Sequence, residues 1–286
     1  MQRLVEVACE AARFEVNHEE NLVYIDKMVL RANMPMHAEI KTMTVKAVLF
    51  DMFDTLMMIE KDHMFYNPSL RSAHRSLVNH DVDVGFSEFR QAYVKARDAI
   101  YAAAEATLGE PHFNVRIADT LCSLGYKYTV DSPAVALATL AFCEEFMKYV
   151  RIDDYAKIVL HELHGRYKLG IVSNFAIPEC VHSLLERHGL TGLFDVVVVS
   201  GAVNKRKPSP EIYAKALELM GVKASETVFV GDTVDADVAG PTKVGMKTVF
   251  IERRFQKEIE QSSPTETIKN LGELPVALKR CLTKAE

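Results

Sequence analysis

The stretch that decides the fold is residues 46–57, KAVLFDMFDTLM. An apolar run ends directly on Asp51, and a second carboxylate follows at Asp54 with a hydroxyl at Thr55. A short run of Ala, Val, Leu and Phe without polar alternation is typical of a strand buried on both faces of a sheet. Asp51 therefore stands at the carboxyl end of a buried strand, where open α/β sheets bind their ligands.

Four further apolar runs follow, and segments of helical length separate them. The runs cover residues 168–173, 194–200, 227–231 and 247–251, and helices are predicted at 178–189, 209–221 and 235–245. Each helical segment ends at a glycine, a common C-terminal signal of helices. Apolar strands that alternate with helices predict an α/β fold with a Rossmann-like, doubly wound parallel sheet.

A long insertion separates the first strand from the second. Residues 51–167 lie between them, whereas a strand-helix-strand unit needs only about 30 residues. Three parts of the insertion, residues 87–109, 113–125 and 132–150, carry apolar residues at helical spacing. We expect an all-helical cap over the carboxyl edge of the sheet.

These patterns divide the chain into three parts. We predict a core domain from residues 43–59 and 153–286, with the cap domain, residues 60–152, inserted into it. Residues 1–42 are expected to form an N-terminal extension, with a helical pattern in residues 5–16 and no site residue.

The composition indicates a globular protein that binds a small molecule. Of the 286 residues, 49% are hydrophobic and 26% are charged, which is enough apolar material for a sizeable core. The net charge is -5, and the basic residues are spread along the chain rather than grouped. This argues against a nucleic-acid or anionic-membrane partner. The oligomeric state stays open.

The cysteine pattern indicates a cytoplasmic protein. The five cysteines are scattered and form no C-x-x-C pair, so we expect reduced thiols. The longest apolar stretch in a helical pattern, residues 134–143, is far shorter than the ~20 residues that cross a bilayer. The N-terminus lacks the charged start and unbroken apolar run of a signal peptide.

Two carboxylates at strand ends predict a metal site. Asp51 ends the first strand, and Asp232 ends the strand at residues 227–231. Carboxylates at neighbouring strand ends repel each other unless a cation lies between them, and Mg²⁺ prefers such oxygen ligands. A bound Mg²⁺ offsets the charge of an incoming phosphoryl group and aligns it for attack by Asp51.

Two more strand ends carry groups that suit an anion. Ser173 and Asn174 follow the second strand, and Lys207 precedes a helix that begins with Ser and Pro. We expect the Ser173 hydroxyl to bind a phosphate oxygen and Lys207 to neutralise both the phosphate and Asp51. Four strand ends thus point to one site.

The residues from about Met43 to Phe255 resemble the haloacid dehalogenase-like hydrolases, in the subgroup with a helical cap after the first strand. The segments that carry this resemblance are VLFDMFDTL, IVSN, KRKPSPEIY and VFVGDTVDAD, in that order, each after a predicted strand. Any one motif is weak evidence, whereas four in order are specific.

The resemblance implies roles for particular residues. Asp51 is then the nucleophile, Thr55 and Ser173 contact the transferred group, and Lys207 stabilises charge. Asp51 and Asp232 bind Mg²⁺, with the main-chain carbonyl of Phe53 as a further ligand. Asp237, or alternatively Asp235, supports the metal, and Asn174 is counted with Phe53 among the substrate-binding residues.

One position departs from the family's phosphatases. Their nucleophile is followed two residues later by an Asp that protonates the leaving group, and here that residue is Phe53. Asp54 is one residue too late, and an Asx turn is its expected role. A positioned acid contributes about 10²–10⁴-fold, so its absence predicts a slow phosphatase or a different reaction. Dehalogenases carry an aromatic residue here, because a halide leaves without a proton.

The fourth motif favours the metal-dependent alternative. Dehalogenases of the family replace Gly231-Asp232 with Ser and Asn, whereas this chain keeps the acidic ligand. Phosphonate-cleaving relatives combine a missing acid with a metal site but need a cap lysine, for which Lys61, Lys95 and Lys127 are the candidates. His63 or His74, at the start of the cap, is a hypothetical substitute acid.

The sequence therefore predicts a Mg²⁺-dependent hydrolase that acts through a covalent Asp51 intermediate, foremost on small phosphate monoesters. A 2-haloacid dehalogenase is the alternative within enzymes. A degenerate member that binds a phosphorylated ligand or a protein is the alternative outside them. The identity of the substrate depends on cap residues that no sequence pattern places.

Overall fold

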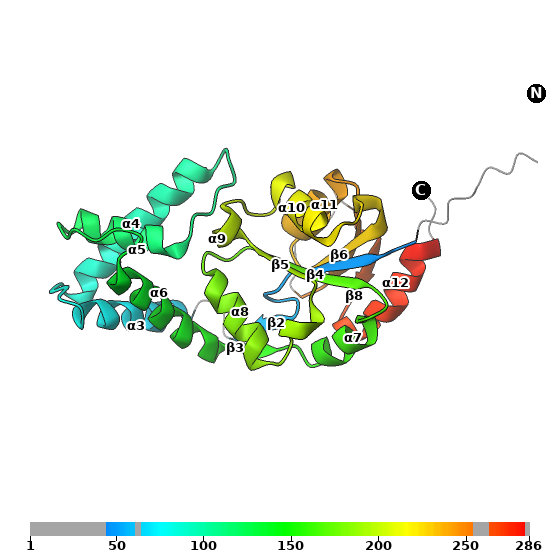
Figure 1. The fold of residues 1–286 in the computed structure, drawn as a ribbon, viewed down its shortest axis with the longest axis horizontal. Helices are drawn as coiled ribbons and strands as arrows, with labels where there is room; N and C mark the ends of the chain where they lie inside the picture. The colour runs from blue at the N-terminus through cyan, green and yellow to red at the C-terminus, as the bar shows by residue number, and fades with distance from the viewer. Residues whose placement is uncertain (1–43, 61–63, 254–262, 284–286) are drawn as a thin grey trace, which may run out of the picture. The chain divides into compact units, whose positions relative to one another are not determined.

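The computed structural model describes residues 44–60, 64–253 and 263–283 (Figure 1). Its main sheet has six parallel strands in the order β5-β4-β1-β6-β7-β8. Their bounds are β1 Ala47–Phe50, β4 Lys168–Ser173, β5 Val196–Val199, β6 Thr227–Gly231, β7 Lys247–Ile251 and β8 Glu266–Ile268. The predicted Rossmann-like α/β fold is confirmed, and its strand order reverses between β1 and β6.

The register of the sheet brings the predicted strand ends together. Phe50 of β1 lies between Ile171 of β4 and Val230 of β6. Asp51 is the next residue along β1, and Ser173 and Asp232 each follow their paired residue by two. All three therefore lie at the carboxyl edge, beside the point where the strand order reverses, which is where such sheets bind ligands.

Helices cover both faces of this sheet, which explains its non-alternating strands. The helices are α7 Ala156–Leu163, α8 Pro178–Arg187, α9 Ser200–Val203, α10 Pro210–Met220, α11 Gly240–Lys243 and α12 Leu274–Thr283. Val48 and Phe50 pack in one core cluster with residues of α7, α8 and α12. Ala47 and Leu49 belong to a second cluster with residues of α10. Each face of β1 is thus apolar and dry.

The insertion is helical from α3 to α6. Its helices are α3 Tyr66–Val78, α4 Phe86–Ala104, α5 Phe113–Ser123 and α6 Pro133–Phe146, which form a separate group in Figure 1. An antiparallel pair of short strands, β2 Met57–Ile59 and β3 Val150–Ile152, connects them to the core. We propose that this pair marks the cap boundaries near residues 60 and 152. The predicted extension, residues 1–42, lies outside the described residues.

Several elements differ from the sequence predictions. The strand predicted at 194–200 is shorter, because Ser200 begins α9. The helix predicted at 235–245 is a π-helix, η4 Val234–Ala239, followed by the single turn of α11. Strands β2, β3 and β8 were not predicted, because each has only three residues. The described residues also form short 3₁₀ turns: η1 Met147–Tyr149, η2 Thr191–Leu193, η3 Ala224–Glu226 and η6 Leu271–Glu273.

Two observations bear on the cysteines and on membranes. Cys122, Cys143 and Cys180 are free thiols. Among the helices that the structure describes, none combines the length and the apolar character needed to cross a bilayer.

Candidate active site

Three buried carboxylates meet at the carboxyl edge of the sheet. Asp51 follows β1 directly, Asp232 follows β6, and Asp237 lies on η4. Their side chains offer oxygen atoms that all lie within 4.8 Å of one another. Asp51 is 8% exposed, Asp232 6% and Asp237 1%. Such a set of buried oxygen ligands suits a hard divalent cation.

Lys207 connects two of these carboxylates. Its Nζ lies 2.6 Å from Oδ1 of Asp51 and 2.7 Å from Oδ1 of Asp237. Asn174 fixes the main chain of this lysine: the Lys207 N–H donates to Asn174 Oδ1 at 2.7 Å, and Asn174 Nδ2 donates to the Lys207 carbonyl at 3.0 Å. Asn174 directly follows β4, so these two bonds fix the loop that carries Lys207 to the end of this strand. The ammonium group is thereby held against Asp51.

The position of Asp237 depends on a glycine. The Thr233 N–H donates to Asp237 Oδ2 at 2.9 Å, so the start of η4 turns this carboxylate back toward β6. A Cβ atom on Gly231 would lie only 2.4 Å from Asp237 Cγ, so no other residue fits there without movement. Asp235, the alternative to Asp237 in the sequence analysis, is exposed.

Burial and crowding raise the pKa of two of these acids, Asp51 and Asp232. Burial raises the pKa of Asp51 to about 6, with Lys207 opposing the rise and Asp237 adding to it. Burial also raises the pKa of Asp232 to about 7, and the charges of Asp51 and Asp237 add to that rise. For Lys207, burial lowers the pKa, but Asp237 and Asp51 outweigh it, so the pKa is raised and the ammonium stays charged. One ammonium against three carboxylates leaves negative charge that a divalent cation balances.

Two hydroxyl groups at the same edge have no partner. Thr55 and Ser173 are both fully buried, and within the described part of the chain neither side-chain oxygen makes a hydrogen bond. Leaving a buried polar group unpaired costs about 1–3 kcal/mol. Such groups call for a ligand that supplies the missing acceptors. The oxygen atoms of a tetrahedral oxyanion could accept hydrogen bonds from both hydroxyls.

A family profile for haloacid dehalogenase-like hydrolases matches residues 45–245. The chain belongs to this family. The hydrolase is 28% identical to the glyceraldehyde 3-phosphate phosphatase of Methanopyrus kandleri over 218 residues, which are 76% of this chain and 88% of that protein. It is also 28% identical to the enzyme of the same name from Methanocaldococcus jannaschii over 232 residues, covering 80% and 95% of the two chains.

Solved structures share the fold of the hydrolase. A haloacid dehalogenase-like phosphatase from Thermococcus onnurineus is 26% identical with a TM-score of 0.56, over 82% of this chain and 97% of that one. A 2-haloacid dehalogenase from Pseudomonas syringae has the same TM-score at 23% identity, over 83% of this chain and 99% of that one, and shows likeness of fold alone.

In the hydrolase, Phe53 is part of an aromatic contact between core and cap. Its ring centroid lies 4.8 Å from that of Phe175, which follows β4, and 5.6 Å from that of Phe146, at the end of α6. The position of the family's acid is thus filled by an apolar ring. Asp54 has a left-handed backbone with φ 58° and accepts a hydrogen bond from the Ile59 N–H at 3.2 Å. Its carboxylate holds the turn that precedes β2.

The next residues to locate are the two histidines proposed as substitute acids and the three candidate cap lysines. His74 Nε2 lies 2.7 Å from the Val84 carbonyl oxygen, and its ring packs against Phe86 and Phe89 inside the cap. That environment indicates a structural role. His63 and Lys61 lie outside the described residues. Lys95 and Lys127 are both exposed on the surface of the cap.

The sequence analysis missed residues that shape the site from a distance. Arg253 donates to the Asp54 carbonyl at 3.2 Å and to the Thr55 carbonyl at 3.3 Å, and it forms an ion pair with Asp153 at 2.7 Å. Glu110 of the cap is buried and accepts a hydrogen bond from Ser200 of the core. No local pattern marks these residues, because their partners lie far away in the chain.

Proposed function

We propose that this hydrolase is a Mg²⁺-dependent phosphatase that acts on small phosphate monoesters through a phosphorylated Asp51. The observation that carries the proposal is the buried group of Asp51, Asp232, Asp237 and Lys207 beside two unpaired buried hydroxyls. Relatives that cover most of the chain are named as phosphatases of a small phosphorylated metabolite, which supports the same activity.

The donor set suits the proposed ion. The carboxylates of Asp51, Asp232 and Asp237 would hold Mg²⁺, with the Phe53 main-chain carbonyl as the further predicted ligand. The ion would offset the negative charge of the phosphoryl group and orient it toward the nucleophile.

The reaction then follows from the positions of the side chains. The Asp51 carboxylate attacks phosphorus, the bond from phosphorus to the ester oxygen breaks, and an acyl phosphate forms on Asp51. The Thr55 and Ser173 hydroxyls donate hydrogen bonds to phosphoryl oxygens, which gives both groups the partners they lack. Lys207 keeps Asp51 in place and balances charge that develops on the transferred group. Water then attacks the acyl phosphate, which releases inorganic phosphate and the free Asp51 carboxylate, and the departing ester oxygen takes its proton from solvent.

Phe53 limits the range of good substrates. No carboxylic acid stands at this position to protonate the departing oxygen, so esters of acidic alcohols or phenols should react fastest. For simple alkyl esters we expect a rate about 10²–10⁴-fold below that of a phosphatase with the acid in place.

Phe53 also favours the second candidate, a 2-haloacid dehalogenase, in which Asp51 displaces halide and forms a carboxylic ester. Halide needs no proton from the enzyme. The acidic group argues against this candidate, because three carboxylates beside the reaction centre repel a haloacid anion unless a cation is bound.

A substrate panel tests both candidates. Phosphate release from aryl phosphates, sugar phosphates and nucleotides is measured with Mg²⁺ and with chelator, and halide release from chloroacetate is measured in the same two conditions. We expect phosphate release that needs Mg²⁺ and no halide release. Halide release that persists in chelator would establish the dehalogenase instead. The cytoplasmic location stays a prediction from the sequence.

A further inference from the structure

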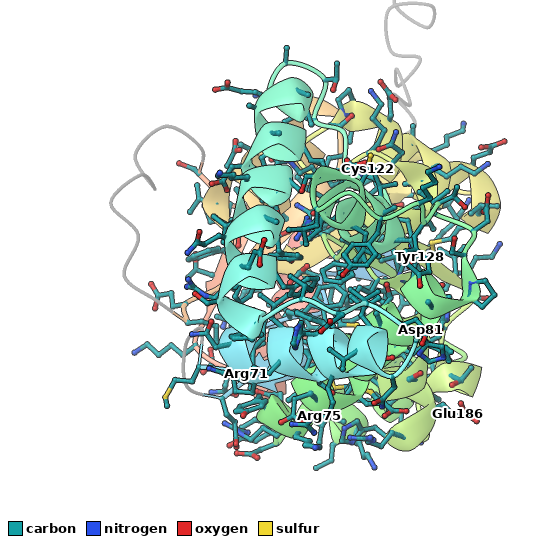
Figure 2. All side chains as sticks on the ribbon, turned by 90° about the vertical axis from the view of Figure 1, so that its left-hand side faces the viewer. Arg71, Arg75, Asp81, Cys122, Tyr128 and Glu186 are labelled. Atoms are coloured by element: carbon teal, nitrogen blue, oxygen red, sulfur yellow. The ribbon has the colours of Figure 1, made fainter. Side chains whose placement is uncertain are left out.

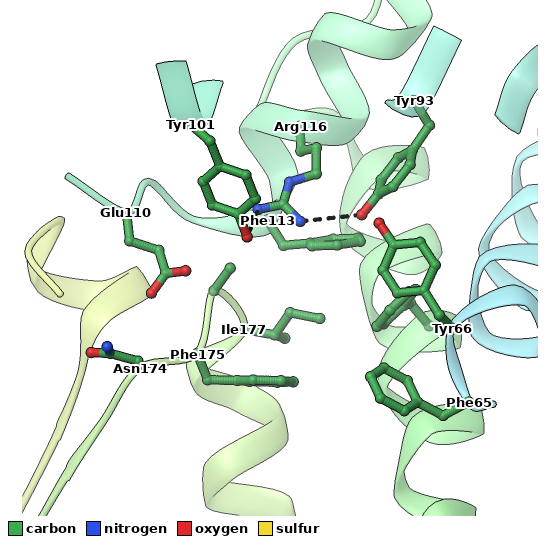
Figure 3. Close-up of a pocket in the computed structure, with 12 residues that line it drawn as sticks. Phe65, Tyr66, Tyr93, Tyr101, Glu110, Phe113, Arg116, Asn174, Phe175 and Ile177 are labelled. Carbon is green, nitrogen blue, oxygen red and sulfur yellow. Dashed lines mark hydrogen bonds between the residues drawn. The ribbon is translucent and has the colours of Figure 1, made fainter. Parts of the chain in front are cut away.

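A cavity of about 190 Å³ lies between the cap and the loop that follows β4 (Figure 3). We call it the cap pocket. Aromatic side chains make up much of its wall, contributed by Tyr66, Tyr93, Tyr101, Phe113 and Phe175. Pockets for drug-sized ligands measure about 300–1,000 Å³, so this one suits a smaller group.

Arg116 brings a positive charge into this aromatic wall, and its guanidinium carbon lies 5.2–5.9 Å from the ring centroids of Tyr93, Tyr101 and Phe113. The residue is 7% exposed, and its guanidinium donates to the hydroxyls of Tyr93 at 3.2 Å and Tyr101 at 3.3 Å. Its Nε is buried without a hydrogen-bond partner, and among the described residues the groups that interact with its charge are the Tyr93 and Tyr101 hydroxyls rather than a carboxylate. Burial raises the pKa of the Tyr93 hydroxyl, so this partner is a neutral phenol. A buried, charged arginine without an anion is costly unless a ligand supplies one.

Glu110 adds a negative charge to the same pocket. Figure 3 shows it on the side next to Asn174, apart from Arg116, and the two form no ion pair. Glu110 is 7% exposed and accepts a hydrogen bond from the Ser200 hydroxyl, which itself accepts one from the Phe175 N–H at 2.8 Å. The cap carboxylate is therefore fixed to the core by a hydroxyl rather than neutralised by a cation.

The cap pocket adjoins the reacting groups through two residues. Asn174 lines the pocket and also binds the main chain of Lys207, whose ammonium contacts Asp51. Phe175 lines the pocket and packs against the Phe53 ring. A substrate with its phosphoryl group at Asp51 would therefore place its leaving group in the cap pocket.

We propose that the cap pocket binds a leaving group that carries a second anionic group, either a carboxylate or a phosphate, which pairs with Arg116. The aromatic side chains flank the body of this leaving group, and Glu110 accepts a hydrogen bond from an O–H or N–H that it bears. This inference rests on the proposed phosphatase activity and specifies its substrate class: small phosphate monoesters with two anionic ends.

Matched esters test the inference. Phenyl phosphate, 4-carboxyphenyl phosphate and hydroquinone bisphosphate share one ring and differ in the group at its far end. We expect wild-type kcat/KM to be about 10- to 100-fold higher for at least one dianionic probe, as charge-assisted hydrogen bonds allow. The preferred probe tells carboxylate from phosphate. Arg116→Gln should abolish the preference, so that the dianionic esters no longer react with a higher kcat/KM than phenyl phosphate.

Two further variants separate binding from folding. Arg116→Lys keeps the charge and should retain part of the preference. Arg71→Gln is the control, because Arg71 is an exposed residue of α3 (Figure 2) and is not among the residues that line the cap pocket. Equal kcat/KM for all three esters in the wild type, or a preference that survives Arg116→Gln, would overturn the inference.

Direct binding keeps this test independent of the proposed activity. Calorimetric titration measures the affinity of the wild type and of Arg116→Gln for two leaving groups. These are 4-hydroxybenzoate, released from 4-carboxyphenyl phosphate, and phenol, released from phenyl phosphate. If no ester is hydrolysed but 4-hydroxybenzoate binds more tightly than phenol in an Arg116-dependent manner, the phosphatase proposal fails and the anion pocket stands. If esters are hydrolysed and neither probe binds differently, the pocket inference fails alone.

Discussion

Two regions of the molecule are built in different ways. One is the carboxyl edge of the sheet where Asp51, Asp232 and Asp237 meet, which we call the acidic edge, and the other is the cap pocket. At the edge, Asp51, Ser173 and Asp232 come from strands whose register brings their ends together. In the cap pocket, Arg116 and Glu110 are fixed by tyrosines and by a serine from distant parts of the chain. The sheet imposes the first arrangement on any sequence that forms these strands. The second depends on packing, which is where relatives with one chemistry can differ in substrate.

Asp51→Asn should give the largest effect, since it removes the proposed nucleophile from the edge and leaves the cap pocket untouched. We expect kcat to fall by more than about 10⁴-fold, as for nucleophiles elsewhere. Phosphate release from 4-carboxyphenyl phosphate measures the loss, and binding of 4-hydroxybenzoate should stay within about threefold.

The matched control for this variant is Asp235→Asn, because Asp235 is an exposed acid on η4 with no place in the acidic group. It should retain full activity. Normal turnover by Asp51→Asn would remove the basis for a covalent mechanism.

Phe53→Asp should produce the next largest effect and tests whether the missing acid limits the rate. The substitution places a carboxylic acid two residues after the nucleophile but removes ring contacts with Phe146 and Phe175. We expect kcat for alkyl phosphates to rise by about 10²-fold and kcat for aryl phosphates to change little. The slope of log kcat against the pKa of the leaving group measures the difference.

Phe53→Asn is the control, because it removes the same ring without adding an acid. A rise in rate with both variants would show that the ring, rather than a missing proton donor, limits turnover.

The strands that position the acidic edge could be predicted, and the cap pocket could not. Residues 168–173, 227–231 and 247–251 form strands with the predicted bounds, because buried parallel strands are continuous apolar runs bounded by turns. Asp51 and Asp232 follow from those bounds. Arg116 and Glu110 lie within a region predicted as helix and loop, but their burial arises only when α4, α5 and the loop after β4 pack together. The spacing of apolar residues along the sequence predicts helices and strands, but it does not show which polar side chains become buried when these elements pack.

Gly231→Ala should have a moderate effect and tests how tightly the edge is packed. The added Cβ would lie 2.4 Å from Asp237 Cγ, so Asp237 or strand β6 must move. We expect a loss of about 1–3 kcal/mol in the free energy of unfolding, with weaker Mg²⁺ binding. Gly192→Ala is the control, since nothing lies within 4 Å of its Cβ position. Denaturant unfolding with and without Mg²⁺ measures the free energy of unfolding and its increase on Mg²⁺ binding. Equal stability of the two variants would contradict the packing described for Asp237.

The smallest expected effect is the pH dependence of stabilisation by Mg²⁺. Folding raises the pKa of Asp51 to about 6 and that of Asp232 to about 7, so the folded, metal-free protein binds protons that the unfolded chain has released above about pH 4. The stability due to these protons is complete below about pH 4 and is lost as the pH rises through 6 and 7. Mg²⁺ competes with the same protons, so its stabilisation should follow the opposite trend.

We therefore expect Mg²⁺ to raise the Tm more at about pH 8 than at about pH 5, by a difference of several degrees. Thermal unfolding in Mg²⁺ and in chelator at the two pH values measures this difference. Asp232→Asn should reduce the Mg²⁺ effect at both values, whereas Asp235→Asn should preserve it. A Tm increment that is independent of pH would mean that the ion binds to groups other than these buried carboxylates, and the acidic edge would then lose its assigned role while the cap pocket kept its own.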